Sequence, residues 1–401
     1  MNRGNFLELL HYTAEQNEEY RLVASENAPG HDKLIAPSIQ KDIINAFAVE
    51  TINKLISDLG DVFFSILVEE ARDGSNKEQM AIILRYVNKR GCVVECLLSI
   101  MHVTDTTALT LKMGIKTLFS KYNLSISRLH GQGYDGASNM RGQFNGLKAL
   151  ILKDNEYAFY VHCFAHQLQL ALVAVAKKDT NIERLFLKVS CVINIVGWSP
   201  RCRDLLNEKQ ALKVKKAIES GELSTRQDLQ LSELNSRFNE GNTKLLICMA
   251  SLNPSDCFQA FDKGKLVRFA QFYPLEFSSI DLMAFELQLD NYINDMRSNS
   301  DFSELNDITS LAQKMVEKKK HLIYSLVYLL ITLALTLLVA TASVERAFSA
   351  MKIVKTHLRN WMGDQFLNDS LIPYVEKDMF DSVDKEMVMQ RFLNMKPRRG
   401  Q

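Results

Sequence analysis

Apolar positions near the start of the chain recur with a helical period. Between residues 35 and 59 they return every three or four positions, as at Ile43 and Phe47 or at Ile52 and Leu55. This spacing gathers them on one face of an amphipathic helix. We therefore predict a helical N-terminal segment over residues 1–60.

The pattern then changes to short apolar runs rich in β-branched and aromatic residues. Residues 62–68, 79–87 and 92–103 are three such runs, and the polar stretch 88–91 separates the last two. Runs of this length between turn residues predict buried strands joined as antiparallel neighbours. We predict a three-stranded antiparallel meander, with Glu69 and Glu70 at the end of its first strand.

Helical and strand-like segments alternate after the meander. A helix is predicted from Thr106 to Tyr122, with Asp105 or Thr106 as its N-cap. The glycine-dense sequence GQGYDG at 131–136 is predicted to be a turn. The remaining predicted elements are a strand at 125–129, a helix near 145–153, a strand at 158–162 and a helix at 164–178. This order predicts an α/β fold with a ribonuclease-H-like core.

Composition places limits on the function. Apolar residues make up 47% of the chain and charged residues 24%, as in globular proteins that bury a core. The net charge is only +1, so nucleic-acid binding would depend on local basic patches or on a module outside this sequence. Seven cysteines without regular spacing argue against a secreted disulfide framework and favour reduced thiols.

One long uncharged stretch has two interpretations. Residues 322–340 contain no charged side chain and follow three consecutive lysines at 318–320. Their length and flanking charges are typical of a membrane-spanning helix. The alternative is a helix buried inside a globular core, and this is the interpretation we favour.

Three acidic residues are candidates for metal-dependent chemistry. Glu69 or Glu70 ends the first predicted strand, Asp135 lies in the glycine-dense segment, and Glu345 lies on a predicted C-terminal helix. Three carboxylates can hold two Mg²⁺ ions that clamp the attacking and leaving oxygens of phosphodiester transfer. The ordinary alternatives are a solvated strand end for the first pair, a turn residue for Asp135 and a surface ion pair for Glu345.

Four ordered blocks of sequence carry a specific resemblance. They read EEARDGSNKEQ at 69–79, GQGYDGASNMRG at 131–142, HCFAHQLQLAL at 162–172, and ATASVERAFSAMKIVKTHLRNWMGDQFLNDSL at 340–371. Together they resemble the hAT superfamily of DNA transposases, and most closely its plant zinc-finger-MYM-type-1-like, TTF-zinc-finger-bearing members. The resemblance covers essentially residues 5–380.

The resemblance implies roles for individual residues. Glu69, Asp135 and Glu345 would be the ancestral catalytic triad and the Mg²⁺ ligands of an active enzyme. Cys163 and His166 match the family's C-x-x-H motif, for which we expect a structural role. A zinc site is the less favoured interpretation, because a tetrahedral site needs four ligands. The C-terminal segment would dimerise, with these candidate contact residues: Leu333, Leu337, Phe348, Met351, Ile353 and Trp361.

Several departures from the family pattern point to impaired catalysis. The first acid of the family is aspartate, and this chain has Glu69, whose extra methylene moves the carboxylate by roughly an ångström. The helical insertion is shortened and lacks the family's T-R-W motif, and no zinc-binding cluster precedes residue 5. Ser325, Thr332 and Leu338 replace a proline, a lysine and a proline, which gives residues 322–340 their membrane-like composition.

The resemblance and these departures define the expected organisation. A helical segment at 1–60 is followed by the first part of a ribonuclease-H-like core at 61–196 and a shortened all-helical insertion at 197–320. A dimerisation segment at 321–380 completes the core, and a tail follows at 381–401.

The leading functional hypothesis is a transposase-derived, catalytically impaired protein that retains dimerisation. An active Mg²⁺-dependent transposase that cleaves and joins DNA is one alternative, and a membrane-anchored interaction protein using 322–340 is another. We expect a homodimer or higher oligomer in the nucleus, with no cofactor unless Mg²⁺ serves an active site. DNA remains a candidate partner, weakened by the missing zinc finger, and membrane association is not expected.

Overall fold

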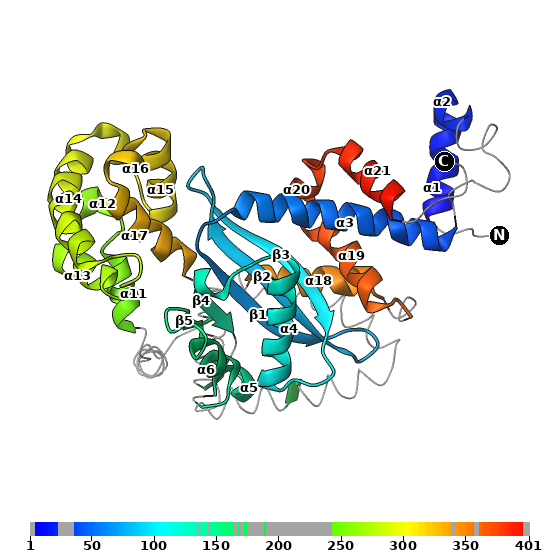
Figure 1. Ribbon diagram of the computed structural model, residues 1–401, viewed down its shortest axis with the longest axis horizontal. Helices are drawn as coiled ribbons and strands as arrows, with labels where there is room; N and C mark the ends of the chain where they lie inside the picture. Colours follow the sequence, from blue (N-terminus) through cyan, green and yellow to red (C-terminus); the bar gives the residue numbers. More distant parts are fainter. Residues whose placement is uncertain are drawn as a thin grey trace.

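A five-stranded sheet lies at the centre of the molecule, with helices on both of its faces (Figure 1). The structure is a computed structural model. It describes residues 5–22, 36–134, 136–142, 144–163, 167–168, 170, 172–174, 188–189, 243–337, 342–356 and 361–395.

The sheet has the strand order β3-β2-β1-β4-β5. Strands β1, β2 and β3 form the predicted antiparallel meander, and β4 and β5 continue the sheet parallel to β1. This mixed order is that of a ribonuclease-H-like core, so the predicted α/β fold is confirmed. The strands are β1 (Phe64–Arg72), β2 (Glu78–Val87), β3 (Val93–His102), β4 (Leu129–Tyr134) and β5 (Phe159–His162).

The glycine-dense segment was wrongly predicted as a turn, because most of it forms β4. Strand β4 lies so close to β1 that a Cβ atom added at Gly131 would come within 2.2 Å of Ser65 Oγ. Glycine is therefore required here by the approach of two strands rather than by a reversal of the chain. The segment predicted as a strand at 125–129 instead contains a 3₁₀ turn, Ile126–Arg128.

One face of the sheet is covered by α3 (Pro37–Leu59) and α4 (Ala108–Lys121), with α6 (Leu147–Leu152) beside them. Helix α4 begins two residues later than predicted, because Thr107 is its N-cap and the Thr107 side chain accepts the Thr110 N–H. The short α5 (Ser138–Arg141) precedes α6, while α1 (Asn5–Gln16) and α2 (Glu18–Arg21) lie at the far end of α3 (Figure 1).

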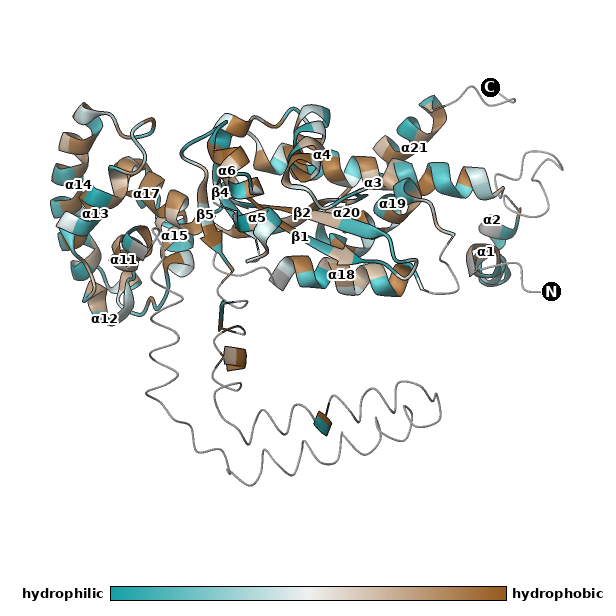
Figure 2. Ribbon diagram, turned by 90° about the horizontal axis from the view of Figure 1, so that it is seen from below, coloured by the Kyte–Doolittle hydropathy of each residue, from teal (hydrophilic) through white to brown (hydrophobic). Residues whose placement is uncertain are grey.

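The opposite face is covered by α18 (Ala342–Val354), which runs beneath the sheet in Figure 2 while α3 and α4 lie above it. Helix α19 (Asp364–Val375) lies alongside the edge strand β3. There Asn368 Oδ1 accepts the Ile100 N–H at 2.8 Å, and Glu376 Oε1 accepts the Leu97 N–H at 2.8 Å. These side chains satisfy donors that an edge strand leaves unpaired.

Residues 243–337 form a separate helical part at one end of the sheet (Figures 1 and 2). Large buried rings such as Phe285 and Tyr292 fill its core together with Leu330. Its longer helices are α11 (Thr243–Ala250), α13 (Lys263–Ala270), α14 (Ser279–Ser298), α15 (Ile308–Glu317) and α17 (Ser325–Thr336), and the short α12 (Ser255–Phe258) and α16 (Lys320–Ile323) connect them.

Helix α17 accounts for most of the uncharged stretch. It has 12 residues, and its buried side chains pack against α14 and α15 and against the sheet. No helix in the described parts of the chain is long and apolar enough to cross a membrane.

The C-terminal segment expected as a tail contains a helix. After α20 (Lys377–Asp381), α21 (Lys385–Asn394) packs Val388 and Phe392 against Ala46 of α3. These apolar side chains recur at helical spacing, so they anchor the helix rather than extending into solvent.

Candidate active site

Strand β1 places Glu69 on the sheet face that carries α18. Side chains alternate along a strand, and the neighbours Leu67 and Ala71 both pack in the cluster beneath α18. Glu69 lies opposite Ala81 of β2 and is half-buried. Because β1 continues to Arg72, Glu69 stands inside the strand and not at its end as predicted.

Glu70 lies on the other face of the sheet. Asn139 Nδ2 donates to Glu70 Oε2 at 3.4 Å and also to the Thr106 carbonyl at 2.8 Å. The two neighbouring glutamates are therefore separated by the sheet. Of the two, only Glu69 faces the helix that carries Glu345.

The predicted second acid, Asp135, lies outside the described residues. On its N-terminal side β4 runs parallel to β1, with Gly133 opposite Leu67. On its C-terminal side, a Cβ atom added at Gly136 would lie 3.1 Å from Cε1 of His162, at the end of β5. The carboxyl ends of β4 and β5 thus approach each other at one edge of the sheet.

Glu345 lies in the first turn of α18 and is exposed. The residues of α18 that face the sheet are Val344, Ala347, Phe348 and Met351.

Contacts at the two ends of α18 define its position along β1. The Ser343 hydroxyl donates to Glu95, which lies opposite Arg85 of β2. At the other end the Lys355 ammonium donates to Asp73, just beyond β1. Arg85 in turn lies opposite Ser65 of β1, so α18 runs in the same direction as β1.

Glu345 is therefore near the N-terminal end of the helix that covers the Glu69 face of the sheet. In the described parts of the chain, no group of three or more His, Cys, Asp or Glu side chains could hold a metal ion. Because Asp135 lies outside the described residues, the expected triad and its Mg²⁺ site remain predictions from the resemblance.

Cys163 is buried directly after β5, where its backbone N–H donates to the Tyr134 carbonyl at 3.3 Å. It thereby continues the pairing of β4 with β5. His166, the other residue of the predicted C-x-x-H motif, lies outside the described residues.

A buried carboxylate that sequence reasoning missed lies in the turn after β1. Asp73 Oδ2 accepts from Lys355 Nζ at 2.6 Å and from Gln79 Nε2 at 3.0 Å. Burial alone raises the pKa of Asp73, but hydrogen bonds from Lys355, Ser75 and Gln79 outweigh it and hold the pKa well below its usual value. The D-x-S pattern of the turn was a usable signal for Asp73, whereas nothing in the sequence pointed to Lys355.

The residues predicted for dimerisation divide into two groups. Four of them are buried inside the chain's own core and are not available to a partner, which corrects the prediction: Leu333, Leu337, Phe348 and Met351. The other two are exposed, with 62% of Ile353 and 98% of Trp361 accessible.

Ile353 lines a groove of about 670 Å³ between α18 and the helices α19 and α20. We call this feature the α18–α20 groove. Apolar side chains from both sides line it, including Tyr374 with 53% of its surface exposed. Charged side chains at the groove are Arg346, Lys377 and Asp381.

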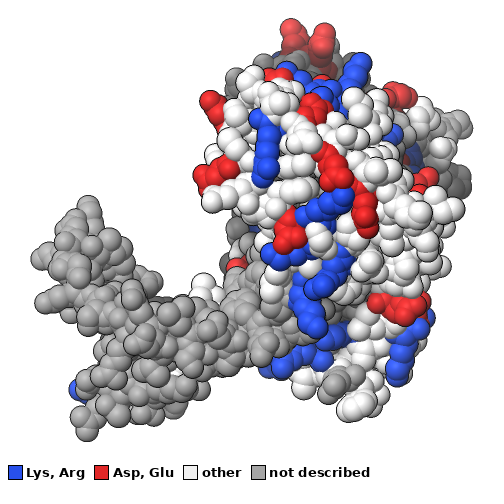
Figure 3. All heavy atoms as spheres, turned by 90° about the vertical axis from the view of Figure 1, so that its left-hand side faces the viewer, with Lys and Arg blue, Asp and Glu red and all other residues white. Residues whose placement is uncertain are grey.

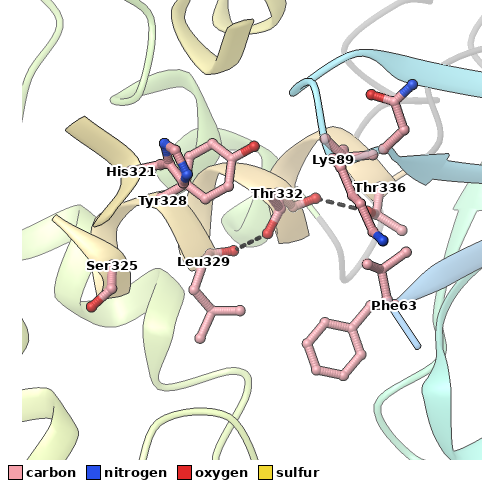
Figure 4. Close-up of a pocket in the computed structure, with 11 residues that line it drawn as sticks. Phe63, Lys89, His321, Ser325, Tyr328, Leu329, Thr332 and Thr336 are labelled. Atoms are coloured by element: carbon pink, nitrogen blue, oxygen red, sulfur yellow. Dashed lines mark hydrogen bonds between the residues drawn. The ribbon is translucent and has the colours of Figure 1, made fainter. Parts of the chain in front are cut away.

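A second cavity, of about 520 Å³, lies between α17 and the β2–β3 hairpin (Figure 4). Ser325 and Thr332, two of the three departures from the family pattern, both line it because they lie seven residues apart on one face of α17. The Thr332 hydroxyl donates to the Leu329 carbonyl at 2.7 Å. Figure 4 shows Lys89 reaching toward Phe63 across this cavity.

Charges on the outer face of the helical part are mixed. Figure 3 shows Lys and Arg side chains running down this face with Asp and Glu side chains between and beside them. Two ion pairs of the helical part are Lys263 with Asp290 at 2.7 Å and Lys318 with Asp301 at 2.7 Å.

Two family matches cover the ends of the chain. Residues 1–146 match the family described as DUF4371, "ZMYM1/FAM200, RNase-like domain". Residues 289–379 match "hAT family C-terminal dimerisation region". The first match includes β1 to β4. The second includes α17 to α19 and all the residues that line the α18–α20 groove except Phe380 and Asp381.

Proposed function

We propose that this chain self-associates and that its ancestral catalytic site is impaired. Its matches to an RNase-like domain and to an hAT C-terminal dimerisation region support an hAT-derived, transposase-like protein. The observation that carries the proposal is the exposed apolar surface within the matched dimerisation region. Ile353, Trp361 and Tyr374 each expose more than half of their surface. Large apolar residues exposed around a groove favour a protein partner.

The partner we propose is a second copy of the chain. A symmetric dimer uses the same patch on both subunits, so the patch must complement itself. The α18–α20 groove meets this requirement because its walls are apolar and its charged residues have both signs. Arg346 and Lys377 are basic, and Asp381 is acidic. A two-fold contact can therefore pair opposite charges around an apolar centre.

Three features support impaired catalysis. Glu69 is longer than the aspartate of the family, and misplacement by about an ångström can lower a rate roughly a hundredfold. Glu345 is exposed in the first turn of α18. The insertion is also shorter than that of the family and lacks the T-R-W motif.

Sedimentation velocity on the full chain tests self-association. We expect the wild type to form a dimer, and Ile353→Glu to weaken it by about a hundredfold, because a charge would enter the apolar contact. Leu322→Glu is the matched control, since Leu322 is 69% exposed but lies on α16, outside the α18–α20 groove. A monomeric wild type, or equal weakening by both substitutions, would contradict the proposal.

Incubation with DNA duplexes carrying hAT-type terminal repeats tests the catalytic part. We expect no strand cleavage with Mg²⁺ or Mn²⁺. Cleavage that disappears in Asp135→Ala would instead support the alternative of an active transposase.

We also expect a fluorescent fusion to localise to the nucleus, as the resemblance implies, and a cytosolic signal would oppose this.

A further inference from the structure

The turn after β1 is built around a carboxylate whose two oxygens are both fully used. Asp73 Oδ1 accepts from the backbone N–H groups of Ser75 and Lys77 at 2.7 and 3.1 Å, and from the Ser75 hydroxyl at 2.7 Å. Asp73 Oδ2 accepts from Gln79 and Lys355. A carboxylate with this many donors is held in one position.

Lys355 reaches this turn from the distant end of the sequence. It continues the last turn of α18, where its N–H donates to the Met351 carbonyl at 2.8 Å. Its side chain and that of Asp73 are both 0% exposed. The ion pair therefore joins the segment matched by the ribonuclease-like family to the segment matched by the dimerisation region.

The same helix carries one wall of the α18–α20 groove. Arg346, Ala350 and Ile353 of α18 line it, and Ile353 is only two residues from Lys355. A helix that slides or rotates moves all of these side chains together. A buried ammonium without its carboxylate is costly, so α18 cannot move away from Asp73 while the chain stays folded around Lys355.

We propose that Asp73 and Lys355 are positioning residues for self-association: their buried ion pair fixes α18 on the sheet in the one position that forms the α18–α20 groove. This inference rests on the proposed function, because it concerns the same groove. The partner remains a second copy of the chain, and it binds only when the N-terminal turn and the C-terminal helix are docked together.

The dimer dissociation constant of the full chain tests this inference. Lys355→Met removes the ammonium but keeps an unbranched side chain of similar length. At a temperature where circular dichroism shows the variant to be folded, we expect its dissociation constant to rise on the order of tenfold. We also expect the amide hydrogens of α18 to exchange faster than in the wild type, because the helix has lost its fixed end.

Lys77→Met is the matched control. Lys77 belongs to the same turn and pairs with Asp364 of α19 at 3.3 Å, but both side chains are exposed to solvent. Exposed pairs contribute little, so we expect its dissociation constant to stay within about twofold of the wild type. If Lys355→Met does not fold, Gln79→Leu removes one donor from Asp73 while the ion pair stays, and we expect a smaller change in the same direction.

The outcomes separate the two proposals. A monomeric wild type contradicts self-association itself. A wild-type dimer whose dissociation constant is unchanged in folded Lys355→Met, or in Gln79→Leu when Lys355→Met does not fold, overturns the positioning role and leaves self-association intact. Equal weakening by Lys77→Met would also overturn it, because the effect would then not depend on burial of the pair.

Discussion

The sheet makes different kinds of contact with α18 and α19 on one side and with the helical part at residues 243–337 on another. Toward α18 and α19, buried polar groups make specific bonds to it, as between Asp73 and Lys355 or between Glu376 and the Leu97 N–H. Toward the helical part, apolar side chains dominate, and the polar contacts include His130 with Glu276 at 2.8 Å and Arg85 Nε with the Leu335 carbonyl at 2.8 Å.

This difference separates contacts that stabilise the fold from contacts that fix the position of a helix on the sheet. Apolar contacts are non-directional and tolerate small shifts of a helix, whereas a buried ion pair fixes one arrangement. Among the described residues, the interface that carries the proposed dimer surface has more of these directional contacts than the interface with the helical part. We infer that the helical part contributes mainly to stability and that the α18–α19 side defines geometry.

The largest effect is expected from breaking the buried pair. Asp73→Asn leaves the Lys355 ammonium without a countercharge, and we expect the free energy of unfolding at pH 7 to fall by about 3–5 kcal/mol. Urea unfolding measures it. A loss below about 1 kcal/mol would show that the pair behaves like a solvent-exposed one.

Acid should reduce this difference. The pKa of Asp73 is lowered in the folded chain, so its contribution is fully present above the ordinary value of 3.8 and is lost as the pH falls toward the folded pKa. We therefore expect the wild type to lose stability more steeply than Asp73→Asn below about pH 4. Parallel curves for the two proteins would contradict the assignment.

The apolar interface should respond through packing alone. Leu333 is fully buried in the helical cluster, so Leu333→Ala should lower the free energy of unfolding by about 2–5 kcal/mol. Trp361→Ala should change it by less than about 0.5 kcal/mol, because Trp361 is exposed, yet it should weaken the dimer. The reverse pattern, measured by urea unfolding and sedimentation, would restore Leu333 as a dimer contact.

Sequence reasoning succeeded for the core of the fold and failed for the surface. Apolar runs and their order predicted the three-stranded meander and the α/β core, because period and length depend on local sequence. The surface could not be predicted in the same way. Leu333 and Ile353 are both large apolar residues on helices, and only the packing of distant elements buries one and exposes the other.

The candidate site shows the same limit. Its family-like blocks predicted Glu69 and Glu345 as site residues, but which of Glu69 and Glu70 faces α18 depends on strand register. The length of β1, underestimated from the apolar run, moved Glu69 into the strand interior. The contact of Lys355 with Asp73 spans the chain, and no local pattern predicts it.

A smaller effect of opposite sign is expected at Glu376. Burial raises the pKa of its carboxyl group, while the Leu97 N–H and Arg346 oppose the shift. A carboxyl with a raised folded pKa favours the folded state more as the pH falls, and it costs stability at neutral pH. Glu376→Gln keeps an acceptor for Leu97, so we expect a gain of less than about 1 kcal/mol at pH 7. The gain should shrink on acidification, and a loss at pH 7 would contradict this account.

The smallest effect concerns a buried hydroxyl of the helical part. Tyr273 Oη is buried and has no hydrogen-bond partner among the described residues, and burial raises the pKa of its phenol. Removing an unsatisfied group sacrifices no bond, so Tyr273→Phe should be neutral or stabilising by up to about 1 kcal/mol. Tyr324→Phe is the matched control, since the Tyr324 hydroxyl donates to Asp295 at 2.8 Å and its loss should cost about 1 kcal/mol. Thermal unfolding of both variants decides the comparison. If Tyr273→Phe destabilises the chain as much as Tyr324→Phe, the Tyr273 hydroxyl has a hydrogen-bond partner. The interface between the sheet and the helical part then contains a further polar contact.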